Sequence, residues 1–181
     1  MTTPLTLAEM ADLVGRCRHV ELLLFARLGE RAPHCDGAAA VVYLAGASRA
    51  HGFRAGLLEA LLPVSDGLGP AAEPTSPTGD GSGELLDVVV GPGKDAELLD
   101  ALVGVVYPAM AAAYAEHLAA AGSPSDAEVR RTLRRVLADL EAVAAEGREF
   151  APGNTRSARA ARARTLLEAA GGPFGPLRRP A

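Results

Sequence analysis

A glutamate lies within the apolar stripe of an expected helix near the N-terminus. The stripe is marked by residues at steps of three and four: Met10, Leu13, Cys17, Glu21, Leu24 and Leu28. This spacing is typical of one face of an amphipathic helix. A carboxylate on such a face needs a partner, because burial of an unpaired carboxylate is costly or raises its pKa. Either outcome gives Glu21 a chemistry suited to proton transfer.

A second expected helix interrupts its apolar face with Ser48 and His51, three residues apart. Two helices joined by a short turn face the same interior, so we expect Glu21 and His51 within one hydrogen bond or one bridging water of each other. We interpret the pair as a catalytic acid and base, with Ser48 orienting a substrate. The alternatives are a Glu21 side chain partly exposed to solvent and a His51 that is only a hydrogen-bonded core residue.

A third expected helix carries Met110, Tyr114 and His117, which we assign to substrate binding beside the acid and base. Tyr114 and His117 are one turn apart and lie near the apolar side of this helix. A simpler interpretation of His117 is a boundary residue at the helix end. A cavity lined by Glu21, His51 and Tyr114 would favour an enzyme. A filled core in which these residues pair with one another would favour a non-catalytic protein.

The composition predicts one domain with an aliphatic, helical core. Of 181 residues, 49% are hydrophobic but only 4% are aromatic, and the long segments are rich in Ala and Leu. The formal net charge of -4 argues against nucleic-acid binding, which requires a basic face. Two cysteines fit a reducing compartment, and we see no apolar run near the ~20 residues of a membrane span. These features predict a cytoplasmic protein without membrane contact.

Capping residues, glycines and prolines divide the chain into helices. We expect helices over about 7–30, from after Asp36 to 62, and over 95–121, 126–149 and 155–170. Thr6 is expected to cap the first, Asp36 the second and Ser125 the fourth. Pro108 should kink the third helix and leave the carbonyl of Gly104 without its intrahelical partner.

The stretch 63–95 is crowded with Gly, Pro, Ser and Asp and has the length to cross a helical bundle from end to end. Within it, 85–90 is expected to form a strand-like piece or a single turn. We place a bundle domain at 1–151 and a short basic helix and tail at 152–181. The tail segment has six Arg against one Glu, a net charge of +5, which leaves -9 for the rest.

Two helix pairs joined by a long crossover, with polar residues on inward faces, resemble the ferritin-like four-helix bundle. That family holds a di-metal site with a Glu from each of two helices and Glu-x-x-His from each of the other two. Glu21 matches the first glutamate, and Ser48-Arg49-Ala50-His51 matches the second motif with serine replacing glutamate. The segment 107–118 looks like the third helix of small actinobacterial ferritin-like proteins.

The expected fourth helix departs from the family pattern. It presents Val136, Leu140 and Val143 inward where ligands would be needed, while Asp139 and Glu141 flank this stripe. We therefore expect a degenerate di-metal site, no resident metal and no other cofactor. A single ion held by Glu21, His51 and His117 is a weaker alternative.

The resemblance and the residues together favour a small-molecule enzyme of specialised metabolism that has lost its iron and uses Glu21 and His51 for acid-base chemistry. The first alternative is a non-catalytic bundle that acts by binding a partner or by dimerisation. The second is a metal-dependent oxygenase with a non-standard site. The expected partners are a small-molecule ligand and a second copy of the chain in a homodimer.

Overall fold

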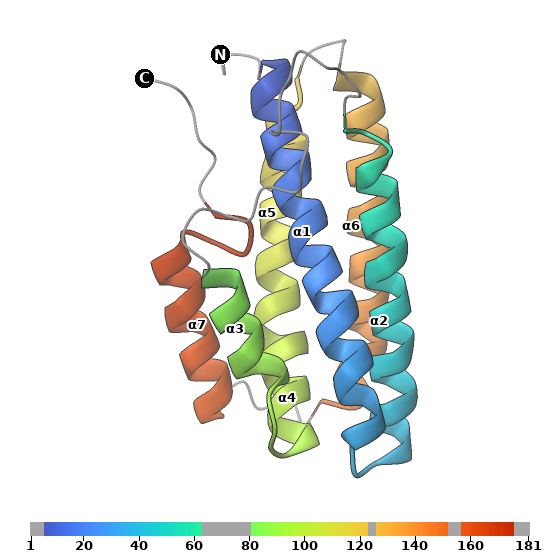
Figure 1. Cartoon of the computed structure of the whole chain (residues 1–181), viewed down its shortest axis with the longest axis vertical. Coiled ribbons are helices and arrows are strands. Elements are labelled where there is room, and N and C mark those ends of the chain that lie inside the picture. The colour runs from blue at the N-terminus through green and yellow to red at the C-terminus, as the bar shows by residue number, and fades with distance from the viewer. Residues whose placement is uncertain (1–5, 63–80, 123–125, 152–156, 176–181) are drawn as a thin grey trace.

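The computed structural model describes residues 6–62, 81–122, 126–151 and 157–175 (Figure 1). Within these ranges the regular secondary structure is helical and contains no strand. The all-helical class predicted from composition is therefore confirmed. The proposed domain boundary after residue 151, the first part of the 63–95 connection and the predicted Ser125 cap lie outside the described residues.

Helix α1 (Leu7–Arg31) begins as predicted, with a reciprocal capping box. The Thr6 hydroxyl accepts a hydrogen bond from the Glu9 backbone N–H, and the Glu9 carboxylate accepts one from the Thr6 N–H. These two bonds satisfy donors that a helix start otherwise leaves unpaired. A 3₁₀ turn, η1 (Ala32–His34), then leads into the next helix.

Helix α2 (Ala38–Glu59) is not capped by Asp36, so that prediction is wrong. Gly37 is the N-cap residue and has no side-chain oxygen to offer. Instead, the Asp95 carboxylate accepts hydrogen bonds from the backbone N–H groups of Asp36 and Gly37. These bonds fix the turn that leads into α2 through a residue 58 positions from Gly37, which local sequence cannot reveal.

The third long helix consists of α4 (Asp95–Ala101), a π-helical segment η3 (Leu102–Val106) and α5 (Tyr107–Ala120). Pro108 lies in the first turn of α5, where its missing N–H is tolerated. The Tyr107 N–H bonds the Leu102 carbonyl five residues back, which is the π pattern. The irregularity predicted at Pro108 therefore takes the form of a wider turn that precedes the proline.

Helices α6 (Ala127–Arg148) and α7 (Ala158–Ala170) follow the predicted positions within a few residues. Helix α6 buries Val136, Leu140 and Val143, as its apolar stripe predicts. Helix α7 ends at Gly171 in the left-handed conformation, and Gly172 bonds the Leu167 carbonyl.

Helix α3 (Gly81–Val90) replaces the strand-like piece predicted for 85–90. Its buried residues recur at helical spacing: Ser82, Leu85, Leu86, Val89 and Val90. The β-branched run at its end favoured a strand, but packing of this face on α1 and α7 determines the outcome.

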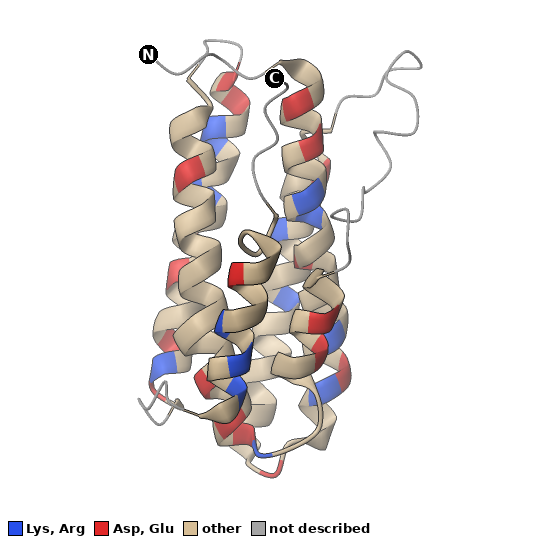
Figure 2. Ribbon diagram, turned by 90° about the vertical axis from the view of Figure 1, so that its left-hand side faces the viewer, with Lys and Arg blue, Asp and Glu red and all other residues tan. Residues whose placement is uncertain are grey.

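Four long helical segments lie side by side: α1, α2, α4–α5 and α6 (Figure 1). Helices α1 and α6 run in one direction, and α2 and α4–α5 run in the other. Helices α3 and α7 form a shorter pair on one side, and α7 packs on both α3 and α4. Figure 2 shows acidic and basic residues interspersed along the helices of the face in view.

The core is continuous across the long helices and is filled mainly by Leu, Val and Ala. Gly147 shows how closely two helices approach, since an added Cβ would lie 2.6 Å from a Val103 methyl. The segment Asp95–Ala120 is long and apolar enough to cross a membrane, with a mean hydropathy of 1.6 over 18 residues. This corrects the statement that no run approaches a membrane span. Because 61% of that window is buried here, the helix fits equally well as a core helix.

Candidate functional site

Glu21 lies in the centre of the core with no exposed surface, and three side chains donate to its carboxylate. His51 Nδ1 lies 2.6 Å from Oε2, the Tyr114 hydroxyl donates to Oε1 at 2.7 Å, and Arg54 Nε lies 3.1–3.2 Å from both oxygens. Helices α1, α2 and α5 each contribute to this cluster. The predicted Glu21–His51 contact is present as a direct hydrogen bond.

His51 is also fully buried and is bonded on both ring nitrogens. Nε2 lies 3.1 Å from the Tyr107 hydroxyl, and the two rings are tilted at a centroid distance of 5.5 Å. With Glu21 ionised, the 2.6 Å contact places the proton on Nδ1, so Nε2 accepts from Tyr107. Arg54 Nη2, which can only donate, then packs against Nδ1 without a hydrogen bond. The order hydroxyl, imidazole, carboxylate is that of an activated nucleophile, although Tyr107 is only 1% exposed.

Arg54 supplies the positive charge in this core. Its guanidinium bonds Glu21 through Nε and contacts Asp139 through Nη1 at 2.5 Å, while Nη2 lies 2.8 Å from His51 Nδ1. Asp139 is 35% exposed in its side chain, so the pair with Arg54 connects the core to the surface of α6. We name Glu21, His51, Arg54, Tyr107, Tyr114 and Asp139 the polar core.

Burial and charge together fix the protonation states of the polar core. Burial would raise the pKa of Glu21, but its contacts with His51, Arg54 and Tyr114 outweigh this and lower it. Burial lowers the pKa of His51 more than Glu21 raises it, so the imidazole is neutral. Burial also raises the pKa of Tyr107 and Tyr114 well above the usual value. The charged groups around His51 are thus the Glu21 carboxylate and the Arg54 guanidinium.

Three residues assigned to substrate binding lie apart from this network. The Ser48 hydroxyl turns toward α1 and donates to the Phe25 carbonyl at 2.7 Å. Met110 is fully buried in the apolar core. His117 is buried rather than at a boundary, with Nδ1 3.5 Å from the Cys17 sulfur. Of the predicted set, only Glu21, His51 and Tyr114 are brought together by hydrogen bonds.

Phe174, beyond α7, packs its ring on Tyr114 at 4.8 Å and on His117 at 5.7 Å between centroids. Its carbonyl accepts a hydrogen bond from Arg16 Nη1 at 3.0 Å. Gly172 and Gly175 on either side have φ of +105° and +70°, which other residues rarely adopt. These glycines let the chain turn back so that Phe174, which lies outside the helices, covers the core.

Arg54 and Tyr107 are the members of the polar core that sequence reasoning missed. A signal for Arg54 was present, because it lies three residues after His51 and therefore on the same side of α2. An arginine is usually assigned to the surface, which conceals that position. Asp139 flanks the inward stripe of α6, and it reaches the network because Arg54 extends toward it rather than because α6 is rotated.

The donor set does not fit the di-metal site that the family resemblance implies. Among residues 6–62, 81–122, 126–151 and 157–175, no group of three His, Cys, Asp or Glu side chains is placed to hold a metal ion. Two divalent ions need several carboxylates, but the carboxylate of Glu21 is occupied by its three donors. Ser48 stands where the second helix would need a glutamate, and its hydroxyl is engaged elsewhere.

Two surface grooves are found among the described residues, and neither is lined by Glu21, His51 or Tyr114. One of about 440 Å³ lies between α5 and α6 and includes Tyr107, Glu141 and Arg148. The other, of about 640 Å³, lies between the end of α1 and the end of α3. Around the acid and base, the side chains of Arg54, Tyr107 and Tyr114 pair with them and are themselves buried.

No family model matches the sequence, and comparison with curated proteins and with solved structures gives no significant match. The geometry of the chain therefore carries the functional argument alone. The polar core pairs a buried carboxylate and a buried guanidinium, joins them to Asp139 at the surface of α6, and can fix the relative positions of four helices. Proton exchange with a substrate would require the core to open.

Proposed function

We propose that this chain is a non-catalytic binding protein built on a ferritin-like four-helix bundle, with a crossover between its second and third long helices. The directions of the four long helices are those such a crossover requires, and this supports the finer fold assignment. The polar core then has a structural role. The observation that carries the proposal is that both carboxylate oxygens of Glu21 accept hydrogen bonds from side chains of the same chain.

Arg54 would take the place that metal ions have in the ferritin-like family. A guanidinium between Glu21 and Asp139 supplies positive charge at the centre of the bundle, as a metal ion would. It also offers five N–H donors in a fixed plane, which can hold carboxylates from two helices at once. In a site of this kind, the arginine provides the cation for the buried Glu21 carboxylate.

The enzyme hypothesis is less well supported by the same contacts. A general acid or base must come within about 3 Å of the proton it transfers, directly or through one water. Glu21 and His51 are both unexposed, and every polar atom of their side chains has a protein partner. Opening would leave charges and aromatic hydroxyls without these partners, which costs free energy.

Chemical modification of histidine separates the structural from the catalytic role. We expect diethylpyrocarbonate to modify exposed His34 rapidly and His51 only on unfolding, when each site is followed by peptide mass spectrometry. The two histidines act as internal probe and control within one sample. Native-state modification of His51 at a rate near that of His34 would show an open site and defeat the proposal.

Elemental analysis combined with native mass spectrometry tests the place given to Arg54. We expect less than one metal ion per chain after purification from a culture supplied with iron. The metal content of an Arg54→Ala variant, which lacks the guanidinium, is measured in the same way. The comparison tests whether the core binds metal once that positive charge is removed. Two tightly held ions in the unaltered protein would contradict the assignment of Arg54 as their substitute.

A further inference from the structure

The groove of about 640 Å³ has two chemically different walls. The end of α1 and the residues after it provide ionic groups, including Arg27, Glu30 and Arg31. The end of α3 and the following turn provide the apolar surface of Leu86, Val90 and Pro92. This volume lies within the roughly 300–1,000 Å³ of small-molecule sites, where apolar walls and a few polar groups are usual.

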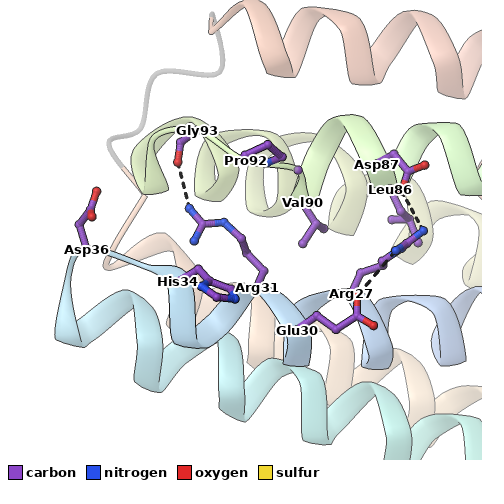
Figure 3. Close-up of a pocket in the computed structure, with 11 residues that line it drawn as sticks. Arg27, Glu30, Arg31, His34, Asp36, Leu86, Asp87, Val90, Pro92 and Gly93 are labelled. Carbon is purple, nitrogen blue, oxygen red and sulfur yellow. Dashed lines mark hydrogen bonds and ion pairs between the residues drawn. The ribbon is translucent and has the colours of Figure 1, made fainter.

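One end of the groove carries excess negative charge. Arg27 bridges across it, 2.9 Å from Asp87 and 3.6 Å from Glu30 (Figure 3). Both carboxylates remain more than half exposed, at 62% for Asp87 and 69% for Glu30. Such exposed ion pairs are weak, so a ligand cation can share these carboxylates with Arg27.

Arg31 crosses the groove toward the turn after α3 and offers a hydrogen-bond donor (Figure 3). Its Nη2 donates to the Gly93 carbonyl and to Asp95, both at 2.9 Å. The side chain is only 10% exposed, and its Nε–H is buried with no acceptor among the described residues. A donor buried without a partner is a cost to the fold, which a ligand oxygen relieves when the Arg31 side chain turns its Nε–H toward the groove.

We propose that this groove binds a small zwitterion with an apolar side chain, of the amino-acid type. The ammonium group contacts Asp87 and Glu30, and the carboxylate accepts from Arg31, with His34 on the same side of the groove. The apolar body lies on Leu86, Val90 and Pro92. Asp36 also lines the groove and Arg31 is paired with Asp95, so the lining holds three carboxylates, Glu30, Asp36 and Asp87, against two guanidiniums, Arg27 and Arg31. This balance favours a ligand with a positive group and disfavours a dianion, while Arg31 provides the donor for a single carboxylate.

This inference rests on the proposed binding function but not on the polar core. Diethylpyrocarbonate protection of His51 tests the core, whereas ligand titration tests the groove. Failure of one therefore does not imply failure of the other.

The experiment uses three probes of nearly the same shape in an NMR titration of the full chain. L-Phenylalanine carries both charges, L-phenylalaninamide only the positive one and N-acetyl-L-phenylalanine only the negative one. We expect L-phenylalanine to bind about tenfold more tightly than either, because each of the other probes lacks one of the two charge-assisted hydrogen bonds. Changes in chemical shift should occur at Leu86–Gly93. Equal affinities, tightest binding of a single-charge probe, shifts elsewhere or no binding would each overturn the proposal.

Two variants assign the ends of the ligand. Asp87→Asn should weaken the binding of L-phenylalanine several-fold and leave the binding of N-acetyl-L-phenylalanine unchanged or tighter. The change of exposed Glu116 to Gln is the control. Arg31→Lys keeps the charge beside Asp95 but removes the Nε–H. It should weaken the binding of both probes that carry a carboxylate without affecting the binding of L-phenylalaninamide. The change of exposed Arg49 to Lys is the control. A parallel unfolding curve confirms that each variant is folded, and equal losses for all three probes would contradict the assigned orientation.

Discussion

Arg54 is the residue on which the charge balance of the polar core depends. Replacing it with Met leaves Glu21 buried with no cation and Asp139 with no partner. Removing one partner of a buried ion pair costs about 3–5 kcal/mol, and we expect that loss for Arg54→Met in urea unfolding. Exposed Arg49 on the same helix is the matched control, and its change to Met should stay within about 0.5 kcal/mol.

The double variant Glu21→Gln with Arg54→Met tests whether the two residues act as a pair. Its loss should be smaller than the sum of the two single losses, because each single change strands a charge that the double change removes. Additive losses would mean that the contact between them contributes nothing to stability.

Phe174 lies outside the helices and covers one side of the core, so its removal should lower the free energy of unfolding. The ring is 1% exposed and packs on Tyr114 and His117. We expect Phe174→Ala to lower the free energy of unfolding by about 3–5 kcal/mol, as for other buried aromatic residues. Phe150, which is 43% exposed and contacts Tyr43, is the control and should lose less than half as much. Equal losses would show that Phe174 is not a core residue.

At the scale of elements, Arg159 holds α7 against α3. Its guanidinium donates to the carbonyls of Val89, Gly91 and Pro92, where α3 ends and the following turn begins. Arg159→Ala should therefore cost about 2 kcal/mol and speed amide exchange along α3. Arg162 on the same helix makes one exposed contact with Glu84, so Arg162→Ala should change neither measurement. Unchanged exchange in Arg159→Ala would show that α7 docks by its apolar face alone.

At the scale of the whole molecule, acid should destabilise the fold in two steps. His51 and His117 have lowered pKa values in the folded protein, with His117 at about 4, mainly because burial disfavours the charged ring. The unfolded chain then binds more protons as pH falls through about 6.5, so stability is lost between about pH 6.5 and 4. Glu21 adds a second loss below its ordinary value of about 4.5, because its folded pKa is lowered too.

Urea unfolding at several pH values measures these losses. His117→Gln should flatten the dependence between about pH 6.5 and 4, because it removes one of the two titrating rings. An unchanged pH dependence in that variant would mean that His117 is not held neutral in the folded state.

The sequence alone determined the helical class, the main helix positions and the meeting of Glu21 with His51. These follow from local causes: caps and breakers mark the helix ends, and a three- to four-residue period shows which face is buried. Two polar residues on the inward faces of neighbouring helices are expected to contact each other, because the rest of the interior is apolar. The all-helical class and the Glu21–His51 contact are confirmed in the structure.

Tertiary structure decided whether those residues lie in an open site or a closed core. Arg54 enters the network by bonding Glu21, Tyr107 by bonding His51 and Asp139 by bonding Arg54, over distances in sequence that no local pattern spans. The Asp95 contact before α2, the helix at 81–90 and the return of Phe174 have the same origin. In each case a partner far along the chain, rather than the neighbouring residues, satisfies the hydrogen bond or buries the apolar face.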